Sequence, residues 1–153
     1  MSDKPKPNPS GADYAGDVSV TDAWAMLKDD PDARLIDVRS IAELSFVGVP
    51  DLSPLGRETV FVELQSFPAM AANPQFVSQA VTALEKSGAR PDSPVFCLCR
   101  SGARSRTAAI ALTRAGYERC YNVAGGLEGD LDAERHRGQL NGWKAAGLPW
   151  RQT

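Results

Sequence analysis

Residues 94–105 read Pro94-Val95-Phe96-Cys97-Leu98-Cys99-Arg100-Ser101-Gly102-Ala103-Arg104-Ser105. The first half is a short apolar run, typical of a strand buried on both faces of a parallel sheet. The second half passes through Gly102 into a helix-like run. A strand that leads directly into a helix is the repeating unit of α/β folds with parallel strands. Cys99 is therefore predicted at the carboxyl end of a buried strand, where such sheets bind their ligands.

The surroundings expected for Cys99 would make its sulfur a nucleophile. Backbone N–H groups at the start of a helix are unpaired and carry partial positive charge, so they stabilise an anion. Arg100 and Arg104 add two full charges nearby. Such surroundings favour the thiolate at neutral pH. A buried structural cysteine is the commoner role for this residue type, but two arginines and a glycine do not describe an apolar pocket.

Short apolar runs alternate with helix-like stretches on both sides of this loop. Strands are predicted at 34–38, 59–62, 94–98 and 120–123. Helices are predicted from a Thr21 cap to before Pro31, from Asn73-Pro74 to Gly88 and from Ser105 to Ala115, with a short terminal helix closing at Gly147. This order predicts a three-layer α/β fold, with a mostly parallel central sheet and helices on both faces.

Length and composition place limits on the domain organisation and the partners. The 153 residues suit one domain, expected at 17–153, after a polar, proline-rich segment at 1–16 that we expect to be a flexible tail. A net charge of −2 argues against nucleic acid as the main partner. No run of 18 apolar residues occurs and the N-terminus lacks the apolar core of a signal peptide, so we expect neither a membrane span nor a signal peptide. Three cysteines, two of them two residues apart, favour reduced thiols and a cytoplasmic location. The oligomeric state stays open.

Three motifs together resemble the rhodanese family. They are the cysteine loop at 99–105, Leu35-Ile36-Asp37-Val38-Arg39 upstream and Asn122-Val123-Ala124-Gly125-Gly126 downstream, in the family's order. The resemblance implies a rhodanese-like fold and a sulfurtransferase of the thiosulfate type. The cysteine of such an enzyme takes sulfane sulfur from a small anionic donor such as thiosulfate and holds it as a persulfide. It then passes the sulfur to a thiophilic small molecule or protein, and no metal or organic cofactor is implied.

The resemblance also assigns roles to individual residues. Cys99 is the catalytic residue, and six loop residues are expected to bind substrate: Arg100, Ser101, Gly102, Ala103, Arg104 and Ser105. Asp37 and Arg39 are expected to support the site structurally, with Asp37 accepting backbone hydrogen bonds and Arg39 paired to a carboxylate. Gly125-Gly126 is expected to let the backbone pass close to the loop. The chain departs from the family at Val47-Gly48-Val49-Pro50-Asp51-Leu52, which lacks a histidine that is usually structural there.

Two alternative functions remain beside the sulfurtransferase. Tyrosine phosphatases place five residues between their cysteine and a phosphate-clamping arginine, whereas only four separate Cys99 from Arg104, and Ser105 occupies the clamp position. A phosphatase is therefore the weaker alternative. The second is a non-enzymatic persulfide carrier or regulatory module acting on a dedicated protein partner. A contiguous apolar surface around the Cys99 mouth would favour this module.

The remaining polar and thiol groups are interpreted mainly as structural. Cys97 could resolve a persulfide or form a disulfide, but a buried apolar filler is the stronger interpretation, and Cys120 is expected in the core. The charged segment 127–142 is expected to be an exposed loop. It carries His136, the only histidine, as a surface residue, and it has no metal-ligand spacing.

Overall fold

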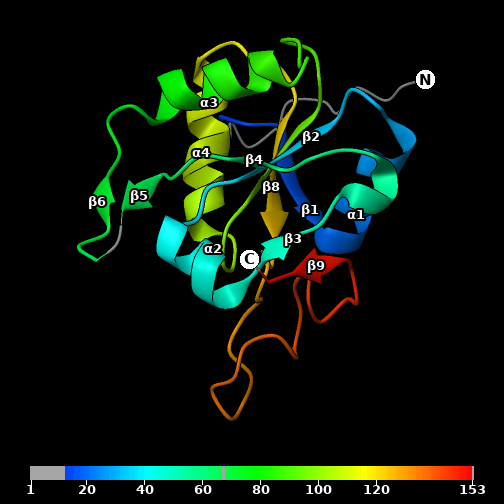
Figure 1. Cartoon of the computed structure of the whole chain (residues 1–153), viewed down its shortest axis with the longest axis vertical. Helices are drawn as coiled ribbons and strands as arrows, with labels where there is room; N and C mark the ends of the chain where they lie inside the picture. Colours follow the sequence, from blue (N-terminus) through cyan, green and yellow to red (C-terminus); the bar gives the residue numbers. More distant parts are fainter. Residues whose placement is uncertain (1–12, 67, 153) are drawn as a thin grey trace.

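A five-stranded sheet lies at the centre of the computed structural model, which describes residues 13–66 and 68–152. Its strand order is β1-β8-β7-β2-β4, and all four neighbouring pairs are parallel (Figure 1). The strands are β1 Gly16–Ser19, β2 Arg34–Asp37, β4 Val60–Phe61, β7 Val95–Leu98 and β8 Cys120–Ala124. The predicted parallel α/β sheet is confirmed, and β7, which precedes Cys99, is its middle strand.

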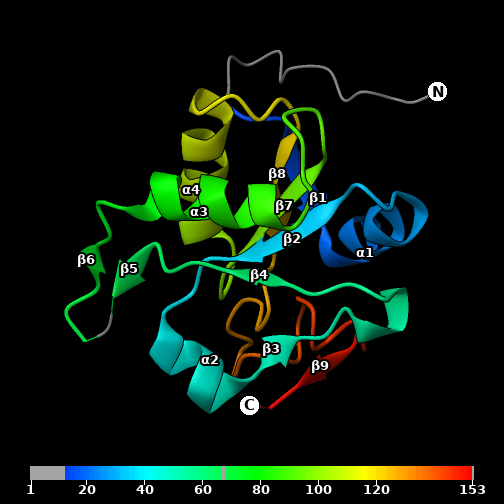
Figure 2. The ribbon, with the colours of Figure 1, turned by 45° about the horizontal axis from the view of Figure 1, so that its top comes forward.

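Helices cover both faces of this sheet. The α-helices of the described residues are α1 Val20–Asp29, α2 Ile41–Val47, α3 Phe76–Lys86 and α4 Ala103–Arg114, of which α1, α3 and α4 cover the sheet. Helices α3 and α4 lie on one face and α1 on the other (Figure 2). Their apolar residues recur at helical spacing, as with Ala80 and Leu84 of α3, and so form one buried stripe. The three layers predicted from the alternation are therefore present.

The strand side chains alternate between two separate cores. Ile36 and Cys97 point into the cluster under α3 and α4, whereas Leu35 and Phe96 point into the cluster under α1. Phe96 stacks on Tyr121 of the next strand, with ring centroids 5.1 Å apart. Because both faces are buried, the strands read as continuous apolar runs rather than as alternating patterns.

Smaller elements surround the carboxyl edge of the sheet. β3 Val49–Pro50 pairs antiparallel with β9 Trp150–Arg151, and β5 Gln65–Ser66 pairs antiparallel with β6 Ala71–Ala72. A 3-10 turn, η1, spans Ser53–Leu55. Helix α2, β3 and β9 lie next to one another below the sheet in Figure 2. They form one wall beside the strand ends at which Cys99 lies.

The element boundaries differ from the sequence predictions in several places. Helix α1 is capped by Ser19, whose hydroxyl accepts the Asp22 N–H at 3.1 Å, rather than by Thr21. Strand β1 and helix α2 are not predicted from the sequence, since both are short: β1 has four residues with a single valine, and α2 has seven residues, none of them fully buried. The terminal helix prediction is wrong, because residues 142–147 form turns with a single i to i+4 bond from Ala146 to Gly142.

The ordered domain begins before the predicted boundary at residue 17. Tyr14 is buried, the Ala15 N–H donates to the Cys120 carbonyl at 2.8 Å, and Gly16 opens β1. The rest of the predicted tail, residues 1–12, lies outside the described residues. None of the helices in the described part of the chain is suited to crossing a membrane.

Candidate functional site: a cysteine loop at the carboxyl edge of the sheet

The loop after β7 bends around the sulfur of Cys99. The Gly102 N–H donates to Cys99 Sγ at 3.1 Å, and the Ser105 hydroxyl lies 3.2 Å from the same sulfur. Gly102 has φ +121° and is the cap residue from which α4 begins at Ala103. A side chain would strain this backbone, so the glycine permits the turn that aims N–H groups at the sulfur. The partial positive end of α4 and these donors together stabilise negative charge on Cys99.

The two loop arginines lie at the mouth of the site in different states. Arg104 makes two hydrogen bonds to Glu43 of α2, at 2.6 and 2.8 Å, and this pair is mostly buried. Arg100 is exposed, and its guanidinium forms no hydrogen bond or ion pair with any other described residue. Arg100 is therefore the available cation, whereas an anion would compete with Glu43 for Arg104. The remaining loop residues, Ser101 and Ala103, belong to the turn, and among the described residues the hydrogen bonds to Cys99 Sγ come from Gly102 and Ser105 instead.

Glu43 ties α2 to the cysteine loop and is ionised by its partners. Burial raises its pKa, but hydrogen bonds from Arg104 and Ser40 outweigh burial and lower the pKa from its ordinary value of 4.5 to about 2. Ser40 caps α2, accepting the Glu43 N–H while Glu43 accepts the Ser40 N–H in a capping box. One carboxylate thus stabilises a helix start and orients an arginine of the cysteine loop.

The Arg104–Glu43 pair predicts how the free energy of unfolding depends on pH. The folded pKa of Glu43 is depressed, so its contribution is present above about pH 4.5 and is lost as pH falls toward about 2. Glu43→Gln should remove about 1–3 kcal/mol of unfolding free energy near neutrality and flatten the decline between these two pH values. Urea unfolding at a series of pH values measures this, with exposed Glu134→Gln as the control. An unchanged acid dependence in Glu43→Gln would contradict the assignment.

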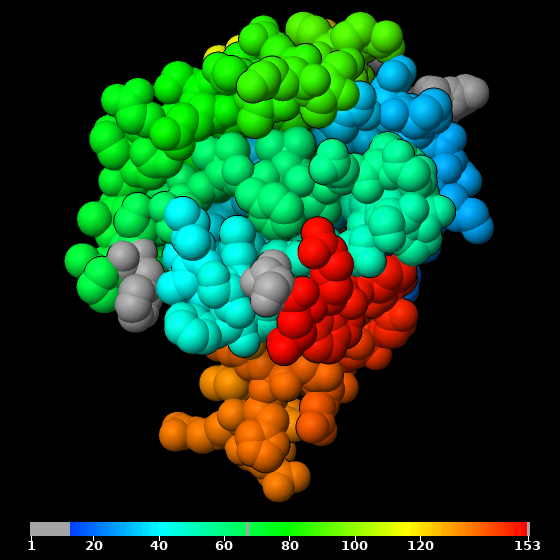
Figure 3. All heavy atoms as spheres, in the orientation of Figure 1, coloured from blue at the N-terminus to red at the C-terminus, as the bar shows by residue number. Residues whose placement is uncertain are grey.

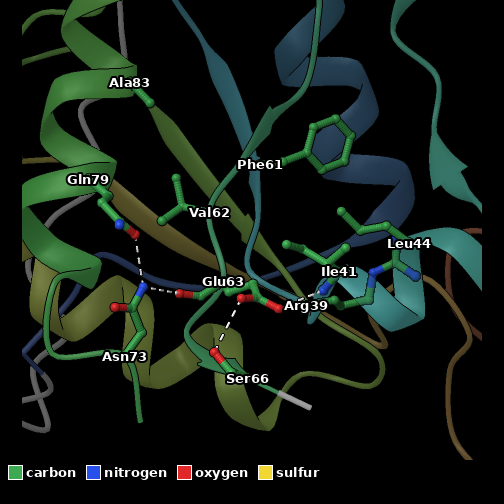
Figure 4. A pocket seen from close by; sticks show the side chains of 10 residues that line it. All are labelled: Arg39, Ile41, Leu44, Phe61, Val62, Glu63, Ser66, Asn73, Gln79 and Ala83. Carbon is green, nitrogen blue, oxygen red and sulfur yellow. Dashed lines mark hydrogen bonds between the residues drawn. The ribbon is translucent and has the colours of Figure 1, made fainter. Parts of the chain in front are cut away.

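Two cavities of about 490 Å³ lie near this edge of the sheet. The mouth of the cysteine site is lined by Ser40, Glu43, Val47, Pro68, Met70, Arg100, Arg104 and Glu128. The other cavity lies between α2, β4 and α3, where Glu63 bonds to Ser66 and Asn73 bonds to Gln79 (Figure 4). Residues 99–105 do not line this second cavity. Of these two cavities, only the first adjoins the cysteine loop, through Arg100 and Arg104.

Asp37 and Arg39 form a buried ion pair beside the loop, consistent with the structural role expected from the sequence. Arg39 donates to both carboxylate oxygens of Asp37, the shortest bond being 2.7 Å, and also to the Gly48 carbonyl at 2.8 Å. The Arg39 N–H donates to Asp37 as well. Both side chains are fully buried. Removing either partner would leave an unpaired buried charge, at a cost of about 3–5 kcal/mol.

The double glycine brings a second backbone segment against the cysteine loop. Gly126 has φ +61°, and a Cβ on it would collide with the Cys99 carbonyl oxygen and lie 2.6 Å from the Arg100 carbonyl carbon. This close approach lets the Leu127 N–H donate to the Cys99 carbonyl at 2.9 Å and the Glu128 N–H donate to the Arg100 carbonyl at 3.0 Å. The expected approach at Gly125-Gly126 is confirmed. It supports the peptide that follows Cys99.

The other two cysteines belong to the core. Burial raises the pKa of Cys97 well above its ordinary value and raises that of Cys120 to about 12. All three cysteines are free thiols. Cys97 and Cys120 are fully buried in the apolar cluster under α3 and α4, which supports the filler interpretation.

The charged segment after the double glycine projects from the body of the protein. It is the orange protrusion in Figure 3, and its middle, including His136, is exposed as predicted. Its two ends are anchored, because Leu127 and Trp143 are fully buried. Within the described residues, no cluster of three or more His, Cys, Asp or Glu side chains has metal-site geometry.

Two contacts of the site went unrecognised in the sequence. One is the Arg104–Glu43 pair, and the other is Asn122 of β8, whose Oδ1 lies 2.5 Å from the Ser105 hydroxyl. Asn122 is only 1 % exposed. A polar residue inside the apolar run Cys120–Val123 was the available signal, because buried polar groups need partners.

Fold and site together define an α/β domain with a cysteine loop at the carboxyl edge of a parallel sheet. The chain belongs to the STR4 middle domain family, whose model matches residues 15–153. An uncharacterized protein of Rickettsia prowazekii is 34% identical over 133 residues, which are 87% of this chain and 94% of the relative. A sulfurtransferase of Allochromatium vinosum is 29% identical over 101 residues, 66% of this chain and 74% of the relative.

Solved structures share the fold. The crystal structure of Rv0390 from M. tuberculosis is 51% identical, with a TM-score of 0.81, covering 92% of this chain and 99% of that chain. The polysulfide-sulfur transferase homodimer of Wolinella succinogenes is 27% identical, with a TM-score of 0.56, covering 93% of this chain and 81% of that one. The parallel α/β architecture is thus shared with a sulfur-transferring protein.

Proposed function

We propose that the chain is a rhodanese-type sulfurtransferase that carries sulfane sulfur as a persulfide on Cys99. The observation that carries the proposal is the sulfur of Cys99 at the start of α4, with the Gly102 N–H and the Ser105 hydroxyl directed at it. Helix N-termini and converging donors stabilise anionic sulfur. The sulfur-transfer names of the Allochromatium and Wolinella proteins support the same chemistry.

The reaction has two displacement steps. The Cys99 thiolate attacks the outer sulfur of thiosulfate, a new S–S bond forms, and the original S–S bond breaks as sulfite leaves with the electron pair. A nucleophilic acceptor then attacks the outer sulfur of the persulfide, and Cys99 departs as the thiolate. The loop N–H groups hold the negative charge between the steps, and covalent catalysis of this kind has ping-pong kinetics.

Exposed Arg100 is the group best placed to attract an anionic donor. Arg104 is paired with Glu43, so in this proposal its main role is to orient the loop. It binds the sulfonate end of thiosulfate only while it remains shared with Glu43. Asp37 and Arg39 hold the strand end that faces the loop. Cys99 is 1 % exposed, so its own sulfur atom is shielded from bulk water.

The mouth also favours a second candidate, a persulfide carrier for a dedicated protein partner. Arg100 and Arg104 are matched there by Glu43 and Glu128, so the mouth has no large excess of positive charge to collect small dianions. Val47, Pro68 and Met70 add apolar surface to the same rim. Such a mixed, partly apolar rim suits a protein surface.

Sulfur loading followed by cyanide challenge tests both candidates. The purified chain is incubated with thiosulfate, and intact mass and peptide mapping should show a gain of one sulfur atom on the peptide carrying Cys99. Cyanide should then remove it as thiocyanate, with repeated turnover. Stable loading without turnover on cyanide would favour the dedicated carrier. Folded protein that takes no sulfur from thiosulfate, mercaptopyruvate or a protein persulfide would overturn the proposal.

A further inference from the structure

A chain of polar side chains runs from Cys99 across two strands to the surface. Ser105 Oγ lies 3.2 Å from Cys99 Sγ and 2.5 Å from Asn122 Oδ1. Asn122 Nδ2 donates to Asp17 Oδ1 at 3.0 Å, and the Tyr14 hydroxyl donates to the same oxygen at 2.9 Å. Ser105 and Asn122 are almost completely buried. This series of hydrogen-bonded side chains is therefore shielded from water at the sulfur and reaches solvent at Asp17.

Strand pairing aligns these groups. In the parallel register β1 is adjacent to β8, and Asn122 is paired with Asp17 on one side and with Cys97 on the other. Ser105 lies in the first turn of α4, which packs on β7 and β8. Because neighbouring strands lie about 4.8 Å apart, side chains at one register position reach each other directly.

Asp17 determines which way the Asn122 amide points. A carboxylate only accepts hydrogen bonds, so Nδ2 must face Asp17. The amide oxygen then faces Ser105 and can only accept. The Ser105 hydroxyl has one proton, and two groups compete for it: Cys99 Sγ and Asn122 Oδ1. It cannot donate to both.

We propose that Asn122, oriented by Asp17, is a positioning residue that draws the Ser105 proton away from Cys99 and so opposes negative charge on the sulfur. With the Ser105 proton on the Asn122 side, a lone pair of Ser105 faces the sulfur and accepts the Cys99 S–H. When Cys99 is a thiolate or a persulfide anion, Ser105 turns its proton toward the sulfur. Ser105 Oγ and Asn122 Oδ1 then lose their shared proton and must move apart. The inference rests on the proposed role of Cys99.

Other charged and titratable groups lie around Cys99 and this polar network, and the Asn122 and Ser105 variants leave all of them in place. They are Tyr14 and Asp17 near β1, Asp37 and Arg39 after β2, Glu43 of α2, Cys97 of β7, Arg100 in the loop, Arg104 and Arg106 of α4, Tyr117 after α4, Cys120 of β8 and Glu128 beyond it. Helix α3 contributes apolar residues to the same cluster. Asn122 is neutral, so replacing it changes the proton competition without removing a charge.

The test is the pH dependence of Cys99 alkylation by iodoacetamide, followed by peptide mass mapping without any sulfur donor. Asn122→Ala should move the midpoint down by about half to one pH unit, since one competing hydrogen bond is removed. Ser105→Ala should move it up, because the donor to the anionic sulfur is lost. In the Ser105→Ala background, Asn122→Ala should have no effect. An unchanged or raised midpoint in Asn122→Ala would overturn the inference.

Two further variants keep the test decisive if Asn122→Ala folds poorly. Asn122→Leu preserves the buried volume and also lacks the acceptor oxygen, so it should give the same downward shift. Asp17→Asn allows the Asn122 amide to turn over, so the midpoint of Cys99 alkylation should also move down in this variant. This downward shift should persist at about 1 M salt, where surface charges are screened within about 3 Å. A shift of Asp17→Asn that vanishes in salt would count against the proposal. This alkylation readout does not depend on sulfur transfer, so failure of the proposed function would be seen separately.

Discussion

Cys99→Ser is expected to abolish both sulfur loading and thiocyanate formation, with a loss of at least about a thousandfold. A serine hydroxyl at this position is not ionised at neutral pH and forms no persulfide. The Gly102 N–H and the Ser105 hydroxyl have room for an oxygen, so the fold should persist. Thiosulfate:cyanide turnover and intact mass measure the loss, and urea unfolding checks the fold.

Cys97→Ala is the matched control for this variant. Cys97 lies two residues earlier on β7, is fully buried, and its pKa is raised well above the ordinary value by burial. It should load sulfur like the wild type, although the smaller side chain will lower stability by about 1–2 kcal/mol. Residual turnover in Cys99→Ser, or loss of sulfur loading in folded Cys97→Ala, would show that Cys99 is not the residue that carries the sulfur.

Gly126→Ala is expected to damage the site without removing any reactive group. Its Cβ would collide with the Cys99 carbonyl oxygen and the Arg100 peptide, which are backbone atoms that cannot rotate away. The loop must shift, and with it the Gly102 N–H that faces the sulfur. We expect turnover to fall at least about tenfold and the unfolding free energy to fall by about 2–4 kcal/mol.

Gly56→Ala separates the collision from the cost of the backbone conformation. Gly56 has φ +69°, close to the +61° of Gly126, but a Cβ there has nothing within 4 Å. Gly56→Ala should therefore cost only the left-handed backbone penalty of about 1 kcal/mol and leave turnover unchanged. Equal losses in the two variants would show that the close approach at Gly126 is unimportant for the loop.

The element types near the site could be predicted because their signals are local. The apolar run Val95–Leu98 reads as a doubly buried strand, and the change of pattern at Gly102 marks the turn into α4. Strand β1 could not be predicted in this way. It is an edge strand whose single valine, Val18, is a weak signal, and pairing with β8 stabilises it.

The resemblance to a family identifies further residues near the site that composition alone does not single out. Gly126 was expected to lie near the loop, and the structure confirms this approach with a reason, the collision that any Cβ would cause. The terminal helix ending at Gly147 was predicted from local pattern and is wrong. The backbone N–H of Trp143 donates to the Gly126 carbonyl instead, so contacts with the double glycine, rather than local helix propensity, determine the conformation of this stretch.

The parallel α/β class, the position of Cys99 at a strand end and the glycine turn behind it can all be derived from the amino-acid sequence. Each follows from residues that are neighbours along the chain. The pairing of Arg104 with Glu43 and the connection of Ser105 through Asn122 to Asp17 are visible only in the folded structure, because these residues are 61, 17 and 105 positions apart. Those contacts depend on strand order and register. Propensity and periodicity carry no information about either, because they describe one element at a time.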